Sequence, residues 1–158
     1  MKIIVMSDTH LNYVTAEFKA ICTRYCSDAD KVVHLGDLVK GPVLDYLEQF
    51  PLEAVAGNMD DNIVQDRLPE KKVFGLGGRR FGIIHGWGPG TSLKSRLSQE
   101  FPDVDAILYG HSHQPFLVQE NGLFWFNPGS VFSGRGGYPP SLGILYLEDQ
   151  IRGEIIPL

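Results

Sequence analysis

Short apolar runs recur along the chain, and most of them stop at a glycine or a polar residue. Residues 2–8, 30–37, 52–58, 80–86 and 105–113 show this pattern most clearly, and isoleucine and valine are common in them. Runs of this length and composition are typical of buried β-strands. We therefore expect at least five strands whose ends carry polar side chains.

Segments with helical periodicity separate several of these runs. Val14, Phe18, Ile21 and Tyr25 recur three or four residues apart, which is the spacing of one face of an α-helix. Residues 60–69 have little periodicity, so we expect a short helix or an ordered loop that overhangs a cleft. The expected helices cover residues 13–26, 42–50 and 93–101, with Asn12 capping the first, Pro42 in the first turn of the second, and Thr91 or Ser92 capping the third.

Hairpin signals dominate the second half of the chain. Gly77-Gly78 lies between two apolar runs, and Asn121-Gly122 separates two more. The first half favours strand–helix units and the second half favours antiparallel pairs, which together predict two packed mixed sheets. The strands expected in the second half include residues 71–76, 79–84, 106–109, 142–147 and 151–156.

The polar residues at the strand ends are of types that bind metal ions. Each of them taken singly is more typical of a turn than of a metal site, and only their combination indicates a metal site. In a sheet flanked by helices, ligands bind at the carboxyl ends of the strands, so these side chains are expected to share one cleft. The fifth histidine of the chain, His34, falls inside a strand and is expected to lie in the interior. The set is Asp8, His10, Asp37, Asn58, His85, His111 and His113.

Five motifs in this order resemble those of the calcineurin-like metallophosphoesterases. They are SDTH at 7–10, LGD at 35–37, GNMD at 57–60, HG at 85–86 and GHSH at 110–113. The resemblance spans the chain and is strongest to small single-domain bacterial and archaeal phosphodiesterases. It implies an α/β fold, a four-layer α/β/β/α sandwich of two mixed β-sheets flanked by helices, in one domain over residues 1–158. It also implies a dinuclear-metal-dependent phosphoesterase, and more narrowly a phosphodiesterase.

The resemblance assigns the seven residues to two divalent metal ions. It implies that a metal-bridging hydroxide attacks the phosphate ester, because two ions lower the pKa of a shared water. Carboxylate, imidazole and amide ligands without a thiolate favour manganese first, with iron, zinc, nickel or magnesium as alternatives. Asp37, Asn58 and His111 are the members expected to act in catalysis. The first ion would be held by Asp8, His10, Asp37 and His113, and the second by Asp37, Asn58, His85 and His111, with one oxygen of Asp37 on each ion.

Two positions depart from the family pattern. Met59 stands where many relatives have a histidine that protonates the leaving group, and Trp87 stands where many small relatives have a second histidine. Asp60 is a candidate for orienting a metal ligand or for stabilising its own loop. Arg135 follows an Asn-Pro-Gly-Ser segment at 127–130 that resembles a family loop near the metals, so it is either a phosphate contact or an ordinary surface arginine.

The charge composition limits the kinds of binding partner that are expected. The 158 residues include 14 basic and 19 acidic ones, giving a formal net charge of −5, so neither a broad nucleic-acid surface nor an anionic-membrane surface is expected. The expected substrate is a small phosphate ester attracted by metal charge. No apolar stretch reaches membrane-spanning length, and Cys22 and Cys26, four residues apart in a predicted helix, fit a reducing cytoplasm.

Two alternatives stay open from the sequence. Phe124, Trp125 and Phe126 are expected to fill a sheet core, but they would also suit a homo-oligomer interface. The second alternative is a non-catalytic scaffold for protein partners, because a subunit of the eukaryotic retromer coat keeps the metallophosphoesterase fold. The complete set of ligand-type residues favours the enzyme.

Overall fold

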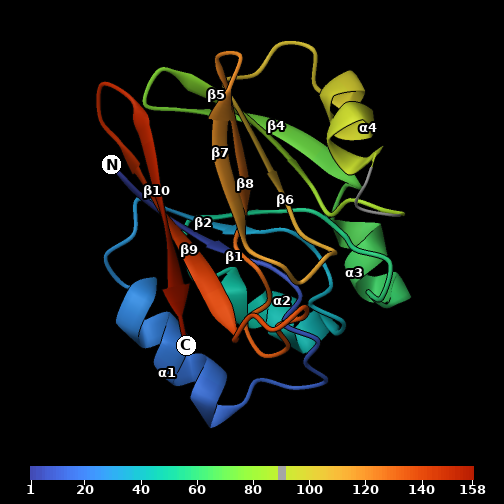
Figure 1. Cartoon of the computed structure of the whole chain (residues 1–158). Coiled ribbons are helices and arrows are strands. Elements are labelled where there is room, and N and C mark those ends of the chain that lie inside the picture. Colours follow the sequence, from blue (N-terminus) through green and yellow to red (C-terminus); the bar gives the residue numbers. More distant parts are fainter. Residues whose placement is uncertain (89–91) are drawn as a thin grey trace.

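The computed structural model describes residues 1–88 and 92–158, and within them two five-stranded mixed sheets pack face to face. The first sheet has the order β10-β9-β1-β2-β3 and the second has the order β4-β5-β6-β8-β7 (Figure 1). The first sheet consists of β1 (Lys2–Met6), β2 (Lys31–His34), β3 (Leu52–Ala54), β9 (Ser141–Leu147) and β10 (Ile151–Pro157). The second consists of β4 (Lys71–Leu76), β5 (Arg79–Ile84), β6 (Ala106–Tyr109), β7 (Phe116–Glu120) and β8 (Leu123–Asn127).

Each sheet contains three adjacent strands that pair in parallel. β1, β2 and β3 are parallel in the first sheet, and β5, β6 and β8 are parallel in the second, while the remaining strands pair antiparallel. Loops that leave the carboxyl ends of parallel strands emerge at one edge of their sheet. This arrangement brings together the polar segments that follow β1, β2, β3, β5 and β6.

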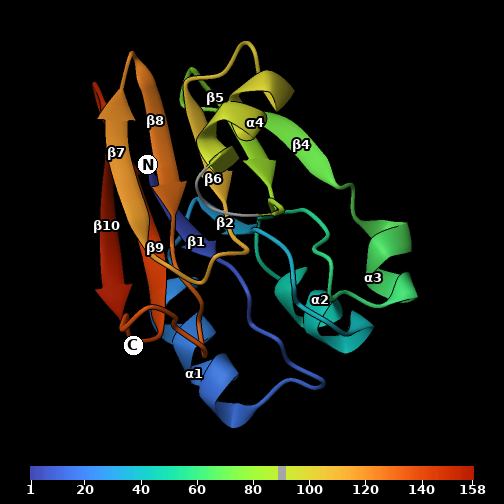
Figure 2. The same cartoon turned by 45° about the vertical axis from the view of Figure 1, so that its right-hand side comes forward.

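Helices cover the outer faces of both sheets (Figures 1 and 2). α1 (Ala16–Tyr25) and α2 (Gly41–Leu47) pack on the first sheet, and the short α3 (Asn62–Arg67) lies next to α2. α4 (Leu93–Glu100) packs on the outer face of the second sheet. The layers therefore run helix, sheet, sheet, helix, and the expected α/β/β/α sandwich is confirmed.

Alternating side chains divide the core into an inner layer and two outer layers. On β1, Ile3 and Val5 pack between the sheets, whereas Ile4 and Met6 pack against the helices, as the two-residue period of a strand requires. Phe124 and Phe126 likewise fill the space between the sheets, and Trp125 packs under α4. These aromatic residues are thus core residues, at most 4% exposed.

The element boundaries correct the expected helix starts and strand ends by a few residues. α1 begins later than expected and is capped by Thr15, whose hydroxyl accepts the Phe18 N–H at 3.1 Å, so the prediction of Asn12 as cap is wrong. Pro42 lies in the first turn of α2 as expected, but this helix ends at Leu47 rather than Phe50. The short helix expected within 60–69 is α3. Thr91 lies outside the described residues, and Ser92 precedes α4 without a capping hydrogen bond from its side chain.

Both hairpin turns form where their glycines predicted them. Gly77 and Gly78 have φ values of 57° and 75° between β4 and β5, and Asn121 and Gly122 have φ values of 52° and 80° between β7 and β8. Two consecutive residues with positive φ give the turn that matches the right-handed twist of paired strands. The two hairpin turns predicted from the sequence are therefore confirmed.

Cys22 and Cys26 face the core below the first sheet and are free thiols. The adjacent Cys26 thiol, together with burial, raises the pKa of Cys22, so both residues act as small apolar side chains there. Among residues 1–88 and 92–158, no helix has the length and apolar character needed to cross a bilayer.

Candidate metal centre

Residues from both sheets meet at the edge where the parallel strands end. Asp8 and His10 follow β1, Asp37 follows β2 and Asn58 follows β3, all from the first sheet. From the second sheet, His85 follows β5, and His111 and His113 follow β6. The expected convergence is observed for most of the set, and it depends on the packing of one sheet against the other.

The backbone at this edge adopts an unusual conformation. Five of the seven candidate residues have positive φ values, between 49° and 66°. A left-handed conformation is unfavourable for residues other than glycine and persists only where the surrounding structure holds it in place, often at functional sites. The five residues are Asp8, His10, Asp37, His111 and His113.

One group of ligand atoms surrounds Asp8 Oδ1. This oxygen lies 3.1 Å from His113 Nε2 and 3.7 Å from His10 Nε2, and the two imidazole nitrogens are 3.2 Å apart. Asp8, His10 and His113 together offer three ligand atoms within 4.8 Å of one another. Among the described residues, buried Asp8 Oδ1 has no hydrogen-bond partner, although such an oxygen normally requires one. A cation would satisfy it.

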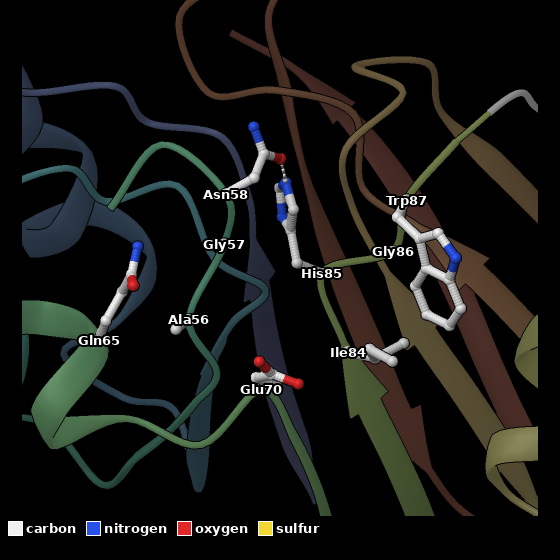
Figure 3. Close-up of a pocket in the computed structure, with 9 residues that line it drawn as sticks. All are labelled: Ala56, Gly57, Asn58, Gln65, Glu70, Ile84, His85, Gly86 and Trp87. Atoms are coloured by element: carbon white, nitrogen blue, oxygen red, sulfur yellow. Dashed lines mark hydrogen bonds between the residues drawn. The ribbon is translucent and has the colours of Figure 1, made fainter. Parts of the chain in front are cut away.

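A second group surrounds Asp37 Oδ2. It lies 3.3 Å from His85 Nε2 and 3.7 Å from His10 Nε2, so this one oxygen faces both groups of imidazoles. His85 Nε2 is also 3.2 Å from Asn58 Oδ1 (Figure 3). The other oxygen, Asp37 Oδ1, accepts the Met59 backbone N–H at 2.8 Å. Asp37 Oδ2 is therefore the oxygen that faces both groups of imidazoles, and the assignment of one Asp37 oxygen to each ion stays a prediction.

Hydrogen bonds to backbone carbonyls orient two of the imidazoles. His85 Nδ1 donates to the Leu35 carbonyl at 2.7 Å, and His113 Nδ1 donates to the Ser133 carbonyl at 2.6 Å. A carbonyl oxygen can only accept, so each Nδ1 carries the proton and the neutral ring keeps its lone pair on Nε2. Both Nε2 atoms point at carboxylates, which is the arrangement seen when histidine ligates a metal ion.

The site concentrates negative charge in a buried place. Burial opposes the ionisation of Asp8 and Asp37, but neighbouring imidazoles outweigh it and lower the pKa of both carboxyl groups. Asp8 in turn raises the pKa of His10, and Asp37 and Asp8 raise that of His85 despite its burial. The two carboxylates therefore require positive charge beside them, and bound divalent cations would supply it.

His111 lies beside these groups without joining either cluster among the described residues. Its ring centroid is 5.3 Å from that of His85, with the rings edge to face. Burial and the nearby His85 lower the pKa of His111, which favours the neutral, ligand-competent imidazole. Its role as a ligand to the second ion stays a prediction.

His34 is a core residue, as expected from its position inside a strand. It is fully buried and its Nε2 lies 3.3 Å from the Thr9 hydroxyl. Burial lowers the pKa of His34 to about 3, so the ring stays neutral. Its contact with Thr9 supports the loop that carries Asp8 and His10.

Asp60 stabilises the loops around Asp37. Its carboxylate accepts the backbone N–H groups of Val39 at 2.6 Å, Gly57 at 2.7 Å and Asp37 at 3.1 Å. Of the two roles considered from the sequence, the loop-stabilising one is observed directly. Through these bonds Asp60 also fixes the backbone of Asp37 and the turn that precedes Asn58.

Close packing explains why the motif at 57–60 begins with a glycine. A Cβ atom at Gly57 would lie 2.2 Å from Asp37 Oδ1, closer than non-bonded atoms approach. Only glycine therefore allows the loop after β3 to lie against the Asp37 carboxylate.

Residues 127–130, which resemble a family loop near the metals, have a supporting role that the sequence did not assign to them. The Ser130 hydroxyl donates to the Asp8 carbonyl at 2.8 Å, and Asn127 donates to the Gly110 carbonyl at 2.9 Å. They belong to the Asn-Pro-Gly-Ser segment, which thereby braces the loops after β1 and β6. Serine and asparagine in a turn carry no sequence signal for this role.

Comparison with known proteins decides the family. A model of the calcineurin-like phosphoesterase superfamily domain matches residues 1–150. The chain belongs to this superfamily. It is 34% identical over 163 residues to a probable metallophosphoesterase of Methanocaldococcus jannaschii, covering 100% of this chain and 82% of that protein. The clusters described above are thus candidate sites for divalent metal ions in a family of metal-dependent phosphoesterases.

Solved structures agree with the superfamily fold. A conserved Streptococcus pneumoniae protein described as a predicted phosphoesterase superposes with a TM-score of 0.76 at 26% identity, over 99% of this chain and 88% of that one. Vps29 from Entamoeba histolytica, solved with Zn²⁺, has a TM-score of 0.75 at 21% identity, over 99% of this chain and 98% of that one. The likeness to Vps29 shows a shared fold.

Proposed function

We propose that this calcineurin-like phosphoesterase is a dinuclear-metal-dependent phosphodiesterase. The observation that carries the proposal is the position of Asp37 Oδ2, which faces His85 on one side and His10 on the other. One ion would be held by Asp8, His10, Asp37 and His113, and the other by Asp37, Asn58, His85 and His111. Two such ions would activate a water molecule and neutralise the charge that develops on the phosphoryl oxygens.

Nearby groups suit the binding of a phosphate ester. Arg135 is exposed, and within residues 1–88 and 92–158 its side chain has no hydrogen-bond or ionic partner. The Arg135 backbone N–H donates to the His113 carbonyl at 3.2 Å. The positive charge of Arg135 also contributes to the lowered pKa of His111. The guanidinium group is therefore available close to the cleft for two phosphate oxygens. This supports the phosphate-contact role over that of an ordinary surface arginine.

The proposed preference for good leaving groups follows from position 59. The side chain of Met59 is 57% exposed beside Asn58 and has no proton to donate. Without an acid at that position, a departing oxygen must leave largely unprotonated, which favours esters with good leaving groups. A small phosphodiester with such a leaving group is the proposed substrate, and manganese is the first candidate metal.

The test combines metal analysis with turnover. The purified protein, stripped with a chelator and reloaded with Mn²⁺, is expected to bind two ions per chain and to hydrolyse bis(p-nitrophenyl) phosphate only when loaded. Iron, zinc, nickel and magnesium are compared in the same assay. Full turnover by a metal-free preparation, or a single ion at saturation, would overturn the two-metal proposal.

The scaffold alternative calls for a discriminator other than metal binding. The Vps29 of Entamoeba histolytica was solved with Zn²⁺, so bound metal does not separate an enzyme from a scaffold. Turnover does separate them: a metal-loaded protein that hydrolyses neither diesters nor monoesters would favour the scaffold.

We further propose that residues 1–158 act as one cytoplasmic domain. Analytical ultracentrifugation would show whether it forms a homo-oligomer.

A further inference from the structure

A pocket of about 470 Å³ opens directly beside the candidate metal centre. Figure 3 shows Asn58 and His85 at one end, Glu70 at the other, and Gln65 and Trp87 on opposite sides. The volume falls within the roughly 300–1,000 Å³ of small-molecule sites, so it leaves space for an ester group next to a phosphate held at the metals.

Trp87 gives this pocket an aromatic wall. The indole is 43% exposed, unlike the other tryptophan, Trp125, which is 4% exposed. Arg96 of α4 donates to the Trp87 carbonyl at 2.6 Å, and its guanidinium carbon lies 5.9 Å from the centre of the ring. Arg96 thereby anchors the backbone at Trp87 and lies near the indole, and an exposed aromatic face is a platform for stacking a planar group.

The pocket also offers hydrogen-bond acceptors, Glu70 at its far end and Gln65 on one side. Glu70 is exposed and has no hydrogen-bond or ionic partner among the described residues. The Gln65 amide N–H donates to the Asp60 carbonyl at 2.7 Å, which leaves its oxygen as an acceptor. A carboxylate and an amide oxygen recognise N–H donors, and the negative charge of Glu70 repels a further anionic group.

We infer that the pocket binds a planar aromatic ester group with N–H donors on its far edge and no additional negative charge, as in a nucleobase. The inference rests on the proposed function, because the phosphate of the same ester would lie at the metal centre. Trp87 would stack on the ring and Glu70 would accept its N–H groups. Trp87, a departure from the family pattern, would thus be a determinant of specificity.

Binding can be measured without turnover through Trp87 itself. In a Trp125→Phe variant the single remaining tryptophan is Trp87, because the chain has two. With Zn²⁺ as the bound ion, methyl phosphate, phenyl phosphate and guanosine 5′-monophosphate are titrated separately. The two aromatic ligands are expected to quench the emission and methyl phosphate to leave it unaltered, with guanosine 5′-monophosphate binding most tightly.

Variants at Trp87 and at Glu70 separate stacking from hydrogen bonding, with affinity measured by calorimetry. Trp87→Ala is expected to weaken both aromatic ligands by about 5- to 150-fold, the usual range for loss of a stacking partner, and Trp87→Phe should restore most of that affinity. Glu70→Ala is expected to weaken only guanosine 5′-monophosphate, by about tenfold. Phe116→Ala, which removes an exposed aromatic ring from the opposite edge strand β7, is the matched control.

The outcomes distinguish this inference from the proposed function. Equal affinities for all three ligands in the parent, or affinities that do not respond to Trp87→Ala, would overturn the assignment of the pocket even if diesters are hydrolysed. Selective aromatic binding without any hydrolysis would instead contradict the proposed function and leave the pocket assignment supported.

Discussion

At the scale of single residues, the two oxygens of Asp37 have different environments. Oδ1 is occupied by the Met59 N–H, and Oδ2 faces His10 and His85. Sequence reasoning identifies the carboxylate but has no means of telling its oxygens apart, since their roles depend on a backbone amide from another loop.

Asp37→Asn is expected to be the most damaging single ligand change. It replaces a charged oxygen shared by two ions, so the loss of kcat/KM should exceed about 100-fold, the upper range for residues that only orient ligands. His10→Ala, which disturbs one ion, should cost less. Metal content and kcat/KM are measured together, with Asp66→Asn on exposed α3 as the control. A smaller loss for Asp37→Asn than for His10→Ala would refute the bridging role.

Met59 provides a test of the leaving-group argument. Its exposed side chain does not fill a space beneath the loop, so Met59→His should be tolerated and place an imidazole beside Asn58. We expect faster hydrolysis of a diester with a poor leaving group, by up to about 100-fold, at a pH where imidazolium is populated. Activated and unactivated diesters are compared in the parent, in Met59→His and in Met59→Gln, which lacks a titratable group. An equal change on both esters would show that position 59 does not face the leaving group.

At the scale of secondary-structure elements, the loops are held by more bonds than their motifs suggest. Asp60 accepts three backbone N–H groups, and the Asn-Pro-Gly-Ser segment braces the loops after β1 and β6. These bonds reach the backbone of Asp37 and Asp8, two of the five candidate ligand residues with left-handed conformations. The left-handed backbone conformations occur in the loops, and regular strands precede these loops.

The first helix offers an element-scale prediction. Thr15 caps α1 by accepting the Phe18 N–H, whereas Asn12 is exposed and has no side-chain hydrogen bond within the described part of the chain. Thr15→Ala should lower the free energy of unfolding by about 1 kcal/mol, and Asn12→Ala should change it by less than about 0.5 kcal/mol. Urea denaturation of the metal-free protein measures both. A larger effect at Asn12 would mean that the helix begins earlier.

At the scale of the whole molecule, the candidate metal centre joins the two sheets. Asp8 and Asp37 come from the first sheet, and His85 and His113 come from the second. Ions bound between them would connect the layers at one edge, while the apolar core between the sheets holds the rest.

Metal loading should therefore stabilise the fold. With the free ion at about 100 times its Kd, each bound ion contributes about 2.7 kcal/mol, which for a chain of this size raises Tm by about 5–10 °C per ion. Differential scanning calorimetry with and without chelator measures the shift. His85→Ala should reduce it, and the same Tm in both conditions would rule out ligation across the sheets.

The sequence by itself determined the strands, the hairpin turns and the identity of the candidate ligands. Alternation on β1 and the Gly77-Gly78 and Asn121-Gly122 turns are local features, and local backbone preference suffices to predict them. The motif order was specific enough to imply the family that the comparisons confirm. Helix starts were less certain, because Thr15 and Asn12 are both competent caps and the path of the preceding loop chooses between them.

Only the tertiary structure decided which atoms meet. The orientation of Asp37 Oδ2, the second hydrogen bond of each imidazole, and the roles of Asp60 and Ser130 all depend on contacts between loops far apart in the sequence. The pocket likewise forms where the loop after β3 of the first sheet meets the ends of β4 and β5 of the second sheet, which carry Glu70 and Trp87. The sequence states which residue types are present. The distances between their side chains and the directions in which these side chains point are set only when the two sheets pack, because each sheet supplies only part of the site.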